Sequence, residues 1–140
     1  VIVGFGPAGQ MVGRAVVEAG GIERVAVVDL SPSMVREAQM MGFEGYIGDA
    51  SQPDVLEHVG ILRAGVVVVA IPDPSGARRT IELIRSLAPE VYIIARARYH
   101  RYIPELEASG AHEVIDEEEL VGDVLAKRLG VRLGGDEDRV

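Results

Sequence analysis

Short apolar runs alternate with amphipathic stretches from one end of the chain to the other. Several of the runs are apolar at every position, which is typical of parallel strands that helices cover on both faces. The predicted strands are Val1–Phe5, Val25–Leu30, Gly45–Ile47, Val66–Ile71, Val91–Ala95 and Glu113–Ile115.

Between these runs, apolar residues recur at helical spacing, as in residues 8–19 and 120–125. Ser31 stands just before Pro32, and Ser51 precedes a helical pattern that contains Pro53, both of which are typical of helix N-termini. Glycines are expected to end helices at Gly20–Gly21, Gly42, Gly60, Gly110 and Gly130. Because strand and helix alternate six times, the pattern predicts βαβ crossovers and one Rossmann-like, doubly wound α/β domain with a parallel six-stranded sheet.

The domain is expected to occupy residues 1–130, and the short, polar segment 131–140 is expected to be a disordered tail. A length of 140 residues fits one domain. The chain begins at Val1 inside a predicted strand, with no initiator Met or signal peptide, so we expect it to be a piece of a longer protein. Its longest uncharged apolar stretch, Ala64–Pro72, is far shorter than the roughly 20 residues that span a bilayer.

The amino-acid composition argues against several kinds of functional site. Aromatic residues make up only 4% of the chain, and the absence of cysteine excludes a disulfide scaffold, cysteine-based zinc sites and a catalytic thiol. A net charge of −8 argues against a nucleic-acid partner. No metal is expected, because the three histidines lack ligand-like spacing and the acidic run from Asp116 to Glu119 is better explained as complementing a helix dipole.

The first predicted strand runs into a G-x-G-x-x-G sequence, Gly4-Phe5-Gly6-Pro7-Ala8-Gly9. In a dinucleotide-binding loop the first glycine allows the tight turn and the second lets the backbone approach a pyrophosphate. The third lets the helix pack on the sheet, with its N-terminal amides facing the anion. The alternative is a tight strand–helix turn with no ligand, but a strand before the motif and a helix after it favour the binding loop.

A carboxylate lies at the end of the second predicted strand, at the position where such domains bind a ribose. Asp29 stands twenty residues after Gly9, where it would accept from both ribose hydroxyls and repel a 2′-phosphate, so it favours NAD over NADP. Leu30 and Ser31 are expected to flank the adenosine. The alternative is that Asp29 caps the next helix, a role that we assign to Ser31 instead.

Three more loops are expected at the same edge of the sheet. Asp49 would hydrogen-bond an adenine amine while Ala50 packs on the ring, the alternative being a plain turn in which Ser51 caps the next helix. Ile71 lies at the end of the predicted fourth strand and is expected to face the glycine loop, while Asp73 beyond it is as well explained as a helix cap.

The basic cluster from Arg96 to Tyr102 follows the fifth strand. Arg96 and Arg98 would hold a carboxylate or phosphate or pair with another subunit. The alternative is a solvated rim, which we favour for Arg101; because Arg96 and Arg98 extend a buried strand, at least one of them needs a partner.

Taken together, these motifs resemble a known family. The glycine loop, Val28-Asp29 and Gly48-Asp49-Ala50-Ser51 are followed by the runs from Ile93 to Arg98 and from Gly110 to Ile115. Their order and spacing are similar to those of the TrkA N-terminal domain, also called the KTN domain or the N-terminal half of RCK. The Ala-Arg-Ala-Arg run is most similar to the cytosolic domain of Kef-type potassium/proton antiporters.

The resemblance implies a cytoplasmic regulatory domain, not an enzyme. Such domains bind NAD, NADH or an adenine nucleotide such as AMP or ATP, form homodimers, and gate a membrane-embedded potassium channel or antiporter. Glutathione adducts also regulate the Kef-type branch, in which the arginine region is implicated. By position, Gly4, Phe5, Gly6 and Gly9 would cradle phosphate, Asp29 the ribose, Asp49 and Ala50 the adenine, and Arg96 or Arg98 would lie near the ligand or a partner domain. Many relatives carry Arg in place of Pro7, which leaves phosphate binding here to backbone amides.

Two enzyme classes are the alternatives. A dehydrogenase needs a substrate domain and a proton donor, for which 140 residues leave no room. A methyltransferase that uses S-adenosylmethionine would share the glycine loop and Asp29, but it normally has a seventh, antiparallel strand, for which the chain is too short. Both rest on fold analogy alone.

Overall fold

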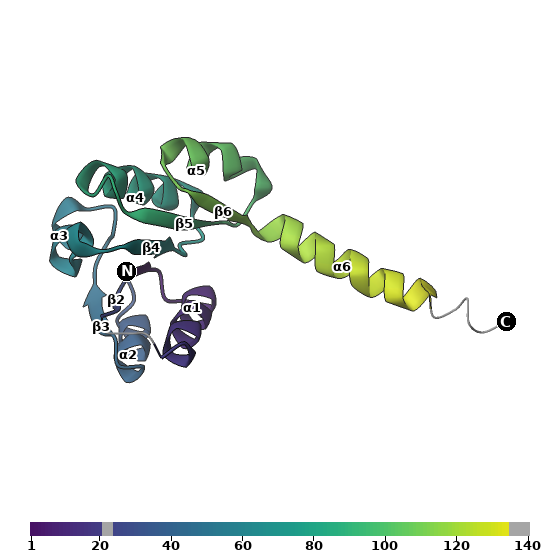
Figure 1. Cartoon of the computed structure of the whole chain (residues 1–140), viewed down its shortest axis with the longest axis horizontal. Coiled ribbons are helices and arrows are strands. Elements are labelled where there is room, and N and C mark those ends of the chain that lie inside the picture. Colours follow the sequence, from purple (N-terminus) through teal and green to yellow (C-terminus); the bar gives the residue numbers. More distant parts are fainter. Residues whose placement is uncertain (21–23, 135–140) are drawn as a thin grey trace.

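Six parallel strands form one sheet in a computed structural model that describes residues 1–20 and 24–134 (Figure 1). The strands are β1 (Ile2–Val3), β2 (Ala26–Asp29), β3 (Glu44–Ile47), β4 (Val66–Val69), β5 (Tyr92–Ala97) and β6 (Glu113–Asp116). Their order is β3-β2-β1-β4-β5-β6, so the chain reverses its winding direction between β1 and β4. The prediction of a doubly wound, six-stranded parallel sheet is confirmed.

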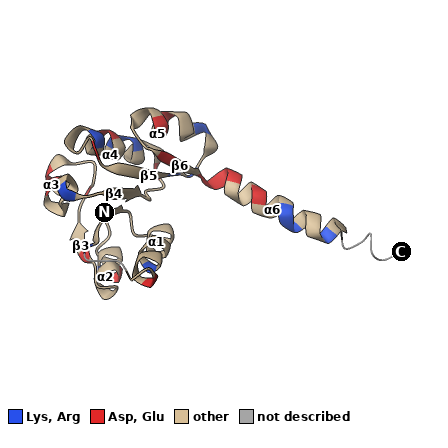
Figure 2. Ribbon diagram, viewed as in Figure 1, with Lys and Arg blue, Asp and Glu red and all other residues tan. Residues whose placement is uncertain are grey.

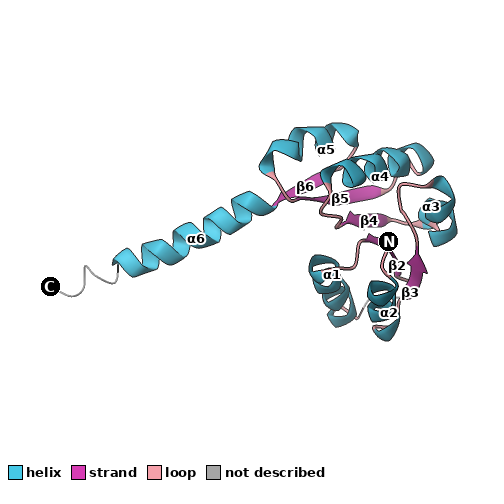
Figure 3. Cartoon of the chain, turned by 180° about the vertical axis from the view of Figure 1, so that it is seen from behind, coloured by secondary structure: helices cyan, strands magenta, loops and turns pink. Residues whose placement is uncertain are grey.

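Helices cover both faces of the sheet (Figures 1 and 3). They are α1 (Pro7–Glu18), α2 (Pro32–Met40), α3 (Pro53–Val59), α4 (Pro74–Leu87), α5 (Ile103–Ser109) and α6 (Glu117–Gly134), with short 3₁₀ turns η1 (Ile61–Arg63) and η2 (His100–Tyr102). α1 and α2 lie on one face, whereas α3, α4 and α5 lie on the other. The core is correspondingly divided: a small cluster around Phe5 and Phe43 lies under α1 and α2, and a larger one around Leu56, Ile81 and Ile93 lies under the other three helices.

Helix α6 differs from the others because it projects away from the sheet (Figures 1 and 3). None of its eighteen residues is buried. The tail predicted over residues 131–140 is therefore wrong for 131–134, which form the last turn of α6, and residues 135–140 lie outside the described part. Gly130 lies inside this helix and does not end it.

The other helix boundaries follow local chemistry. Gly20, Gly42, Gly60 and Gly110 have positive φ angles at helix ends, as expected, while Gly21 lies outside the described residues. Asp73 caps α4 by accepting from the N–H of Gly76 at 3.0 Å.

One predicted cap is wrong, and the other is confirmed in its position only. Gln52, not Ser51, is the N-cap residue of α3. Ser31 stands at the N-cap of α2, but its hydroxyl pairs with Ser33 and not with the helix backbone. No helix in the described ranges is long and apolar enough to cross a membrane.

Candidate functional site

A cavity of about 1110 Å³ lies at the carboxyl edge of the sheet, at the switch point between the neighbouring strands β1 and β4. Ligands of doubly wound sheets bind at this position because the connections leave a crevice there. The cavity is lined by the glycine loop, the ends of β2, β4 and β5, the loop after β3, and the first turns of α6.

The backbone geometry of the loop requires glycine at two of its three glycine positions. Gly4 has φ +91°, a conformation that disfavours any side chain, and its N–H donates to the carbonyl of Val28 at 2.9 Å. A Cβ at Gly9 would lie 2.1 Å from the carbonyl oxygen of Gly4, so only glycine lets α1 pack this closely on β1. A Cβ at Gly6 would meet nothing within 4 Å, so the protein itself does not require that glycine.

Phe5 does not line the cavity, contrary to its expected place in the phosphate cradle. Its ring is fully buried and packs edge-on against Phe43, with Gly13 making room for both rings. Its N–H donates to Asp29 Oδ2 at 2.7 Å. The main-chain donor that a phosphate would use at this position is therefore already occupied.

Three other amides at the start of α1 remain available. The N–H groups of Gly6, Ala8 and Gly9 meet no acceptor among the residues that the structure describes. Pro7 has no N–H to offer. Unpaired amides at a helix N-terminus, together with the helix dipole, favour an anion.

Asp29 connects the glycine loop to the end of β2. While Oδ2 accepts from Phe5, Oδ1 accepts from the N–H of Ser31 at 2.8 Å. Each oxygen keeps a lone pair, so the carboxylate can still accept from hydroxyl groups of a ligand. Leu30 is 71% exposed at the rim of the cavity, and Ser31 does not line it.

The loop after β3 places Asp49 and Ala50 against the cavity. Asp49 accepts from both the N–H and the hydroxyl of Ser51, and these hydrogen bonds lower the pKa of its carboxyl group. Ala50 is buried in the core while still lining the cavity. Ile71, after β4, lines the opposite side.

The two arginines of the basic cluster have different roles. β5 runs to Ala97, beyond its predicted end, and so includes Arg96. Arg96 pairs with Glu117 at 2.7 Å and donates to the carbonyl of Ala70 at 3.3 Å, which satisfies the expectation that one arginine needs a partner. Arg98 lines the cavity with an exposed guanidinium, and within 1–20 and 24–134 no carboxylate pairs with it.

The sequence analysis missed the wall formed by α6. The cavity is also lined by Met34, Tyr99, Glu117, Glu118, Leu120, Val121, Gly122 and Leu125. The apolar spacing of Leu120, Val121 and Leu125 predicted a helix, but periodicity does not say which surface the helix faces.

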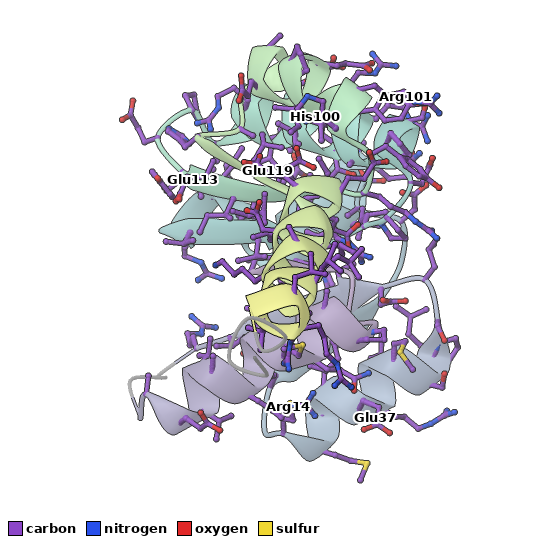
Figure 4. All side chains as sticks on the ribbon, turned by 90° about the vertical axis from the view of Figure 1, so that its right-hand side faces the viewer. Arg14, Glu37, His100, Arg101, Glu113 and Glu119 are labelled. Carbon is purple, nitrogen blue, oxygen red and sulfur yellow. The ribbon has the colours of Figure 1, made fainter. Side chains whose placement is uncertain are left out.

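The base of α6 is held by a second ionic contact. His100 Nδ1 pairs with Asp116 Oδ2, and Asp116 Oδ1 accepts from the N–H of Glu119. The hydrogen bond to Asp116 raises the pKa of His100, and the same bond lowers the pKa of Asp116. Figure 4 looks along α6 and shows His100 and Glu119 together at its base, and Figure 2 shows that the acidic residues of α6 gather at this end.

Most of the predicted site residues therefore meet at one cavity. Those that line it are Gly4, Gly6, Pro7, Asp29, Leu30, Asp49, Ala50, Ile71, Arg96 and Arg98. Ala8 and Gly9 lie at the start of α1 behind the loop, and Phe5 and Ser31 act through their N–H bonds to Asp29.

Strand order, switch point and glycine loop together define a Rossmann-type domain of the nucleotide-binding class. A model of the TrkA-N domain matches residues 1–117, and the chain belongs to this family. The resemblance drawn from the sequence is thereby confirmed.

One relative and two solved structures give the comparison detail. The glutathione-regulated potassium-efflux system protein KefC of Cronobacter sakazakii is 32% identical over 135 residues. That match covers 94% of this chain but 22% of KefC, so the chain spans about a fifth of that relative's length. The C-terminal domain of Kef from Shewanella denitrificans, in its AMP-bound form, superposes with a TM-score of 0.81 at 30% identity and covers 95% of this chain and 79% of that one. The GsuK channel bound to NAD has the same fold, with a TM-score of 0.72 at 19% identity over 81% of this chain and 20% of that chain.

Proposed function

We propose that this chain is a regulatory domain that binds NAD(H) or an adenine nucleotide such as AMP or ATP and controls a potassium channel or potassium/proton antiporter. The observation that carries the proposal is the set of unpaired N–H groups of Gly6, Ala8 and Gly9 at the start of α1, where Gly6 lines the cavity together with Asp29. The AMP-bound Kef domain and the NAD-bound GsuK channel support this ligand class.

We expect a nucleotide to bind in one direction. Its phosphate would bind at the N-terminus of α1, its ribose hydroxyls would donate to the remaining lone pairs of Asp29, and its adenine would lie by Asp49 and Ala50. Because a 2′-phosphate would face the Asp29 carboxylate, we expect NAD to bind more tightly than NADP.

A regulatory role is favoured over catalysis by what the polar side chains already bind. Both oxygens of Asp29 accept backbone amides, one oxygen of Asp49 accepts twice from Ser51, and Arg96 is paired with Glu117. These groups position the backbone, and none of the three is left as an unengaged acid or base beside the glycine loop.

The proposal that this domain binds a partner rests on the exposed apolar residues of α6. Its apolar residues Leu120, Val121, Val124, Leu125 and Leu129 are all more than half exposed. Covering such a stripe favours association, so we expect a homodimer in which α6 packs on a second copy. The membrane-embedded part of the transporter would lie in the same or a separate chain, with this domain in the cytoplasm.

Control of the transporter would follow from linkage. A ligand shifts a conformational equilibrium only through its different affinities for two arrangements. Because α6 forms one wall of the cavity, any change in the direction of α6 alters the ligand's surroundings.

Calorimetric titration with NAD, NADH, NADP, AMP, ATP and S-adenosylmethionine tests the proposal. We expect binding of at least one of NAD, NADH, AMP or ATP, and weaker binding of NADP than of NAD. Binding of S-adenosylmethionine alone would indicate the methyltransferase alternative, and binding of none of these ligands would refute the nucleotide site.

Two Gly→Ala variants make the titration specific to the loop. A Cβ at Gly6 or at Gly65 meets nothing within 4 Å, so both variants should fold. Gly6 faces the cavity, and Gly65 does not line it. Gly6→Ala should weaken nucleotide binding about tenfold, or about 1.4 kcal/mol, by keeping the phosphate away from the backbone. Gly65→Ala should bind like the unchanged protein.

A further inference from the structure

The peptide groups on both sides of Phe5 are fixed by side chains from other parts of the site. Asp29 Oδ2 accepts the Phe5 N–H at 2.7 Å. Gln10 Nε2 donates to the Phe5 carbonyl at 3.0 Å and lies 3.6 Å from Met34 Sδ. The sequence analysis assigned no role to Gln10, which does not line the cavity.

The bond from Gln10 matters because of peptide geometry. The carbonyl of Phe5 and the N–H of Gly6 belong to the same peptide unit, which is planar and trans. In a trans peptide these two groups point in opposite directions. By holding the carbonyl on the protein side, Gln10 therefore fixes the opposite direction for the Gly6 N–H.

This peptide needs such a restraint because one of the two residues that it joins is Gly6. Glycine allows backbone rotations that other residues resist. The backbone N–H of Gln10 also donates to the carbonyl of Gly6 at 2.9 Å, so one residue of α1 holds two successive carbonyls of the loop.

We propose that Gln10 is a positioning residue that aims the N–H of Gly6 at the phosphate of the bound nucleotide, while Asp29 holds the preceding peptide. This inference rests on the proposed nucleotide binding. It predicts that loss of the Gln10 amide affects the phosphate part of the ligand and leaves the adenosine part unaffected, because the ribose and adenine contacts do not depend on the Phe5 carbonyl.

The test compares AMP with adenosine as probes. Gln10→Met keeps the side-chain length but removes the donor, and Gln39→Met is the matched control on the exposed side of α2. We expect Gln10→Met to bind AMP about tenfold more weakly and adenosine unchanged, and Gln39→Met to bind both normally. A loss of equal size for both probes would indicate a merely structural role and would overturn the inference.

A ligand-free readout accompanies the titration. The Gly6 amide should give one sharp ¹H–¹⁵N resonance in the unchanged protein and a shifted or broadened one in Gln10→Met. Should Gln10→Met not fold, Gln10→Glu, which places a carboxylate against the Phe5 carbonyl, serves as the second variant. If the unchanged protein binds AMP and both Gln10 variants bind it equally well, the inference fails while the proposed function stands. If the unchanged protein binds no nucleotide, the proposed function fails, and the inference fails with it.

Discussion

Adding one methyl group at each of two glycines of the same loop should have different effects on the stability of the fold. A Cβ at Gly9 would lie 2.1 Å from the Gly4 carbonyl oxygen, whereas a Cβ at Gly6 would meet no atom within 4 Å. Gly9→Ala should therefore destabilise the fold, and Gly6→Ala should leave its stability almost unchanged.

The size of the effect at Gly9 follows from what can move. The contact is with backbone, so no side-chain rotation relieves it, and overpacking of this kind costs up to about 3 kcal/mol. Alanine is favoured over glycine inside a helix by about 1 kcal/mol, which offsets part of that cost. The expected net loss is about 2 kcal/mol, or a melting temperature lower by roughly 6–8 °C in a domain of this size.

Gly6 precedes α1 with φ −68°, a value that alanine adopts freely. Gly6→Ala should therefore change stability by no more than about 0.5 kcal/mol. Thermal melts and urea unfolding of both variants and the unchanged protein provide the measurement. Equal stabilities for Gly9→Ala and Gly6→Ala would show that α1 does not approach β1 as closely as the structure indicates.

Three further predictions concern the rest of the molecule. Arg85 donates to the carbonyls of Pro89, Val91 and Gly110, so Arg85→Ala should lower the free energy of unfolding by about 2 kcal/mol in urea titrations, and an unchanged midpoint would contradict this. The pairing with Asp116 raises the pKa of His100, so the pair stabilises the protein fully below the ordinary histidine pKa of 6.5. This stabilisation is lost as the pH rises through the raised pKa of His100. Melts of the unchanged protein and of His100→Asn should therefore converge on the alkaline side. The lowered pKa of Asp116 adds a loss in strong acid, and parallel curves from neutral to alkaline pH would refute the pairing. Leu125→Asp should abolish self-association in sedimentation without lowering stability, because Leu125 is 65% exposed in a single chain, and an unchanged sedimentation coefficient would exclude α6 from the interface.

The sheet was predictable because its signal is local. Continuous apolar runs mark strands that are covered on both faces, and the predicted runs contain every residue of β1, β2 and β4. The predicted runs miss the first residue of β3 and the last residues of β5 and β6. β1 is shorter than predicted because the positive φ of Gly4 ends it before Phe5. β5 is longer than predicted because the Arg96 side chain donates to Glu117 and to the Ala70 carbonyl, while the Arg96 backbone continues the strand.

The details of the site were less predictable because they depend on contacts between distant residues. Asp29 is identifiable from its spacing, but its bonds to Phe5 and Ser31 depend on where β2 ends relative to the glycine loop. Gln10 occupies one face of an ordinary helix, and only the folded loop places the Phe5 carbonyl within its reach.

The contacts of helix α6 determine how ligand binding can be coupled to the direction of this helix in the proposed regulation. The Arg96–Glu117 pair and the His100–Asp116 pair hold its base, and both lie beside or near the cavity that the ligand would fill. An anionic ligand drawn to Arg96 competes with Glu117, so its binding energy depends on whether α6 keeps that partner. A tenfold difference in affinity between two directions of α6 supplies about 1.4 kcal/mol, which is within the usual range for coupling between sites. Because linkage is reciprocal, a partner that fixes the direction of α6 must change nucleotide affinity by the same factor.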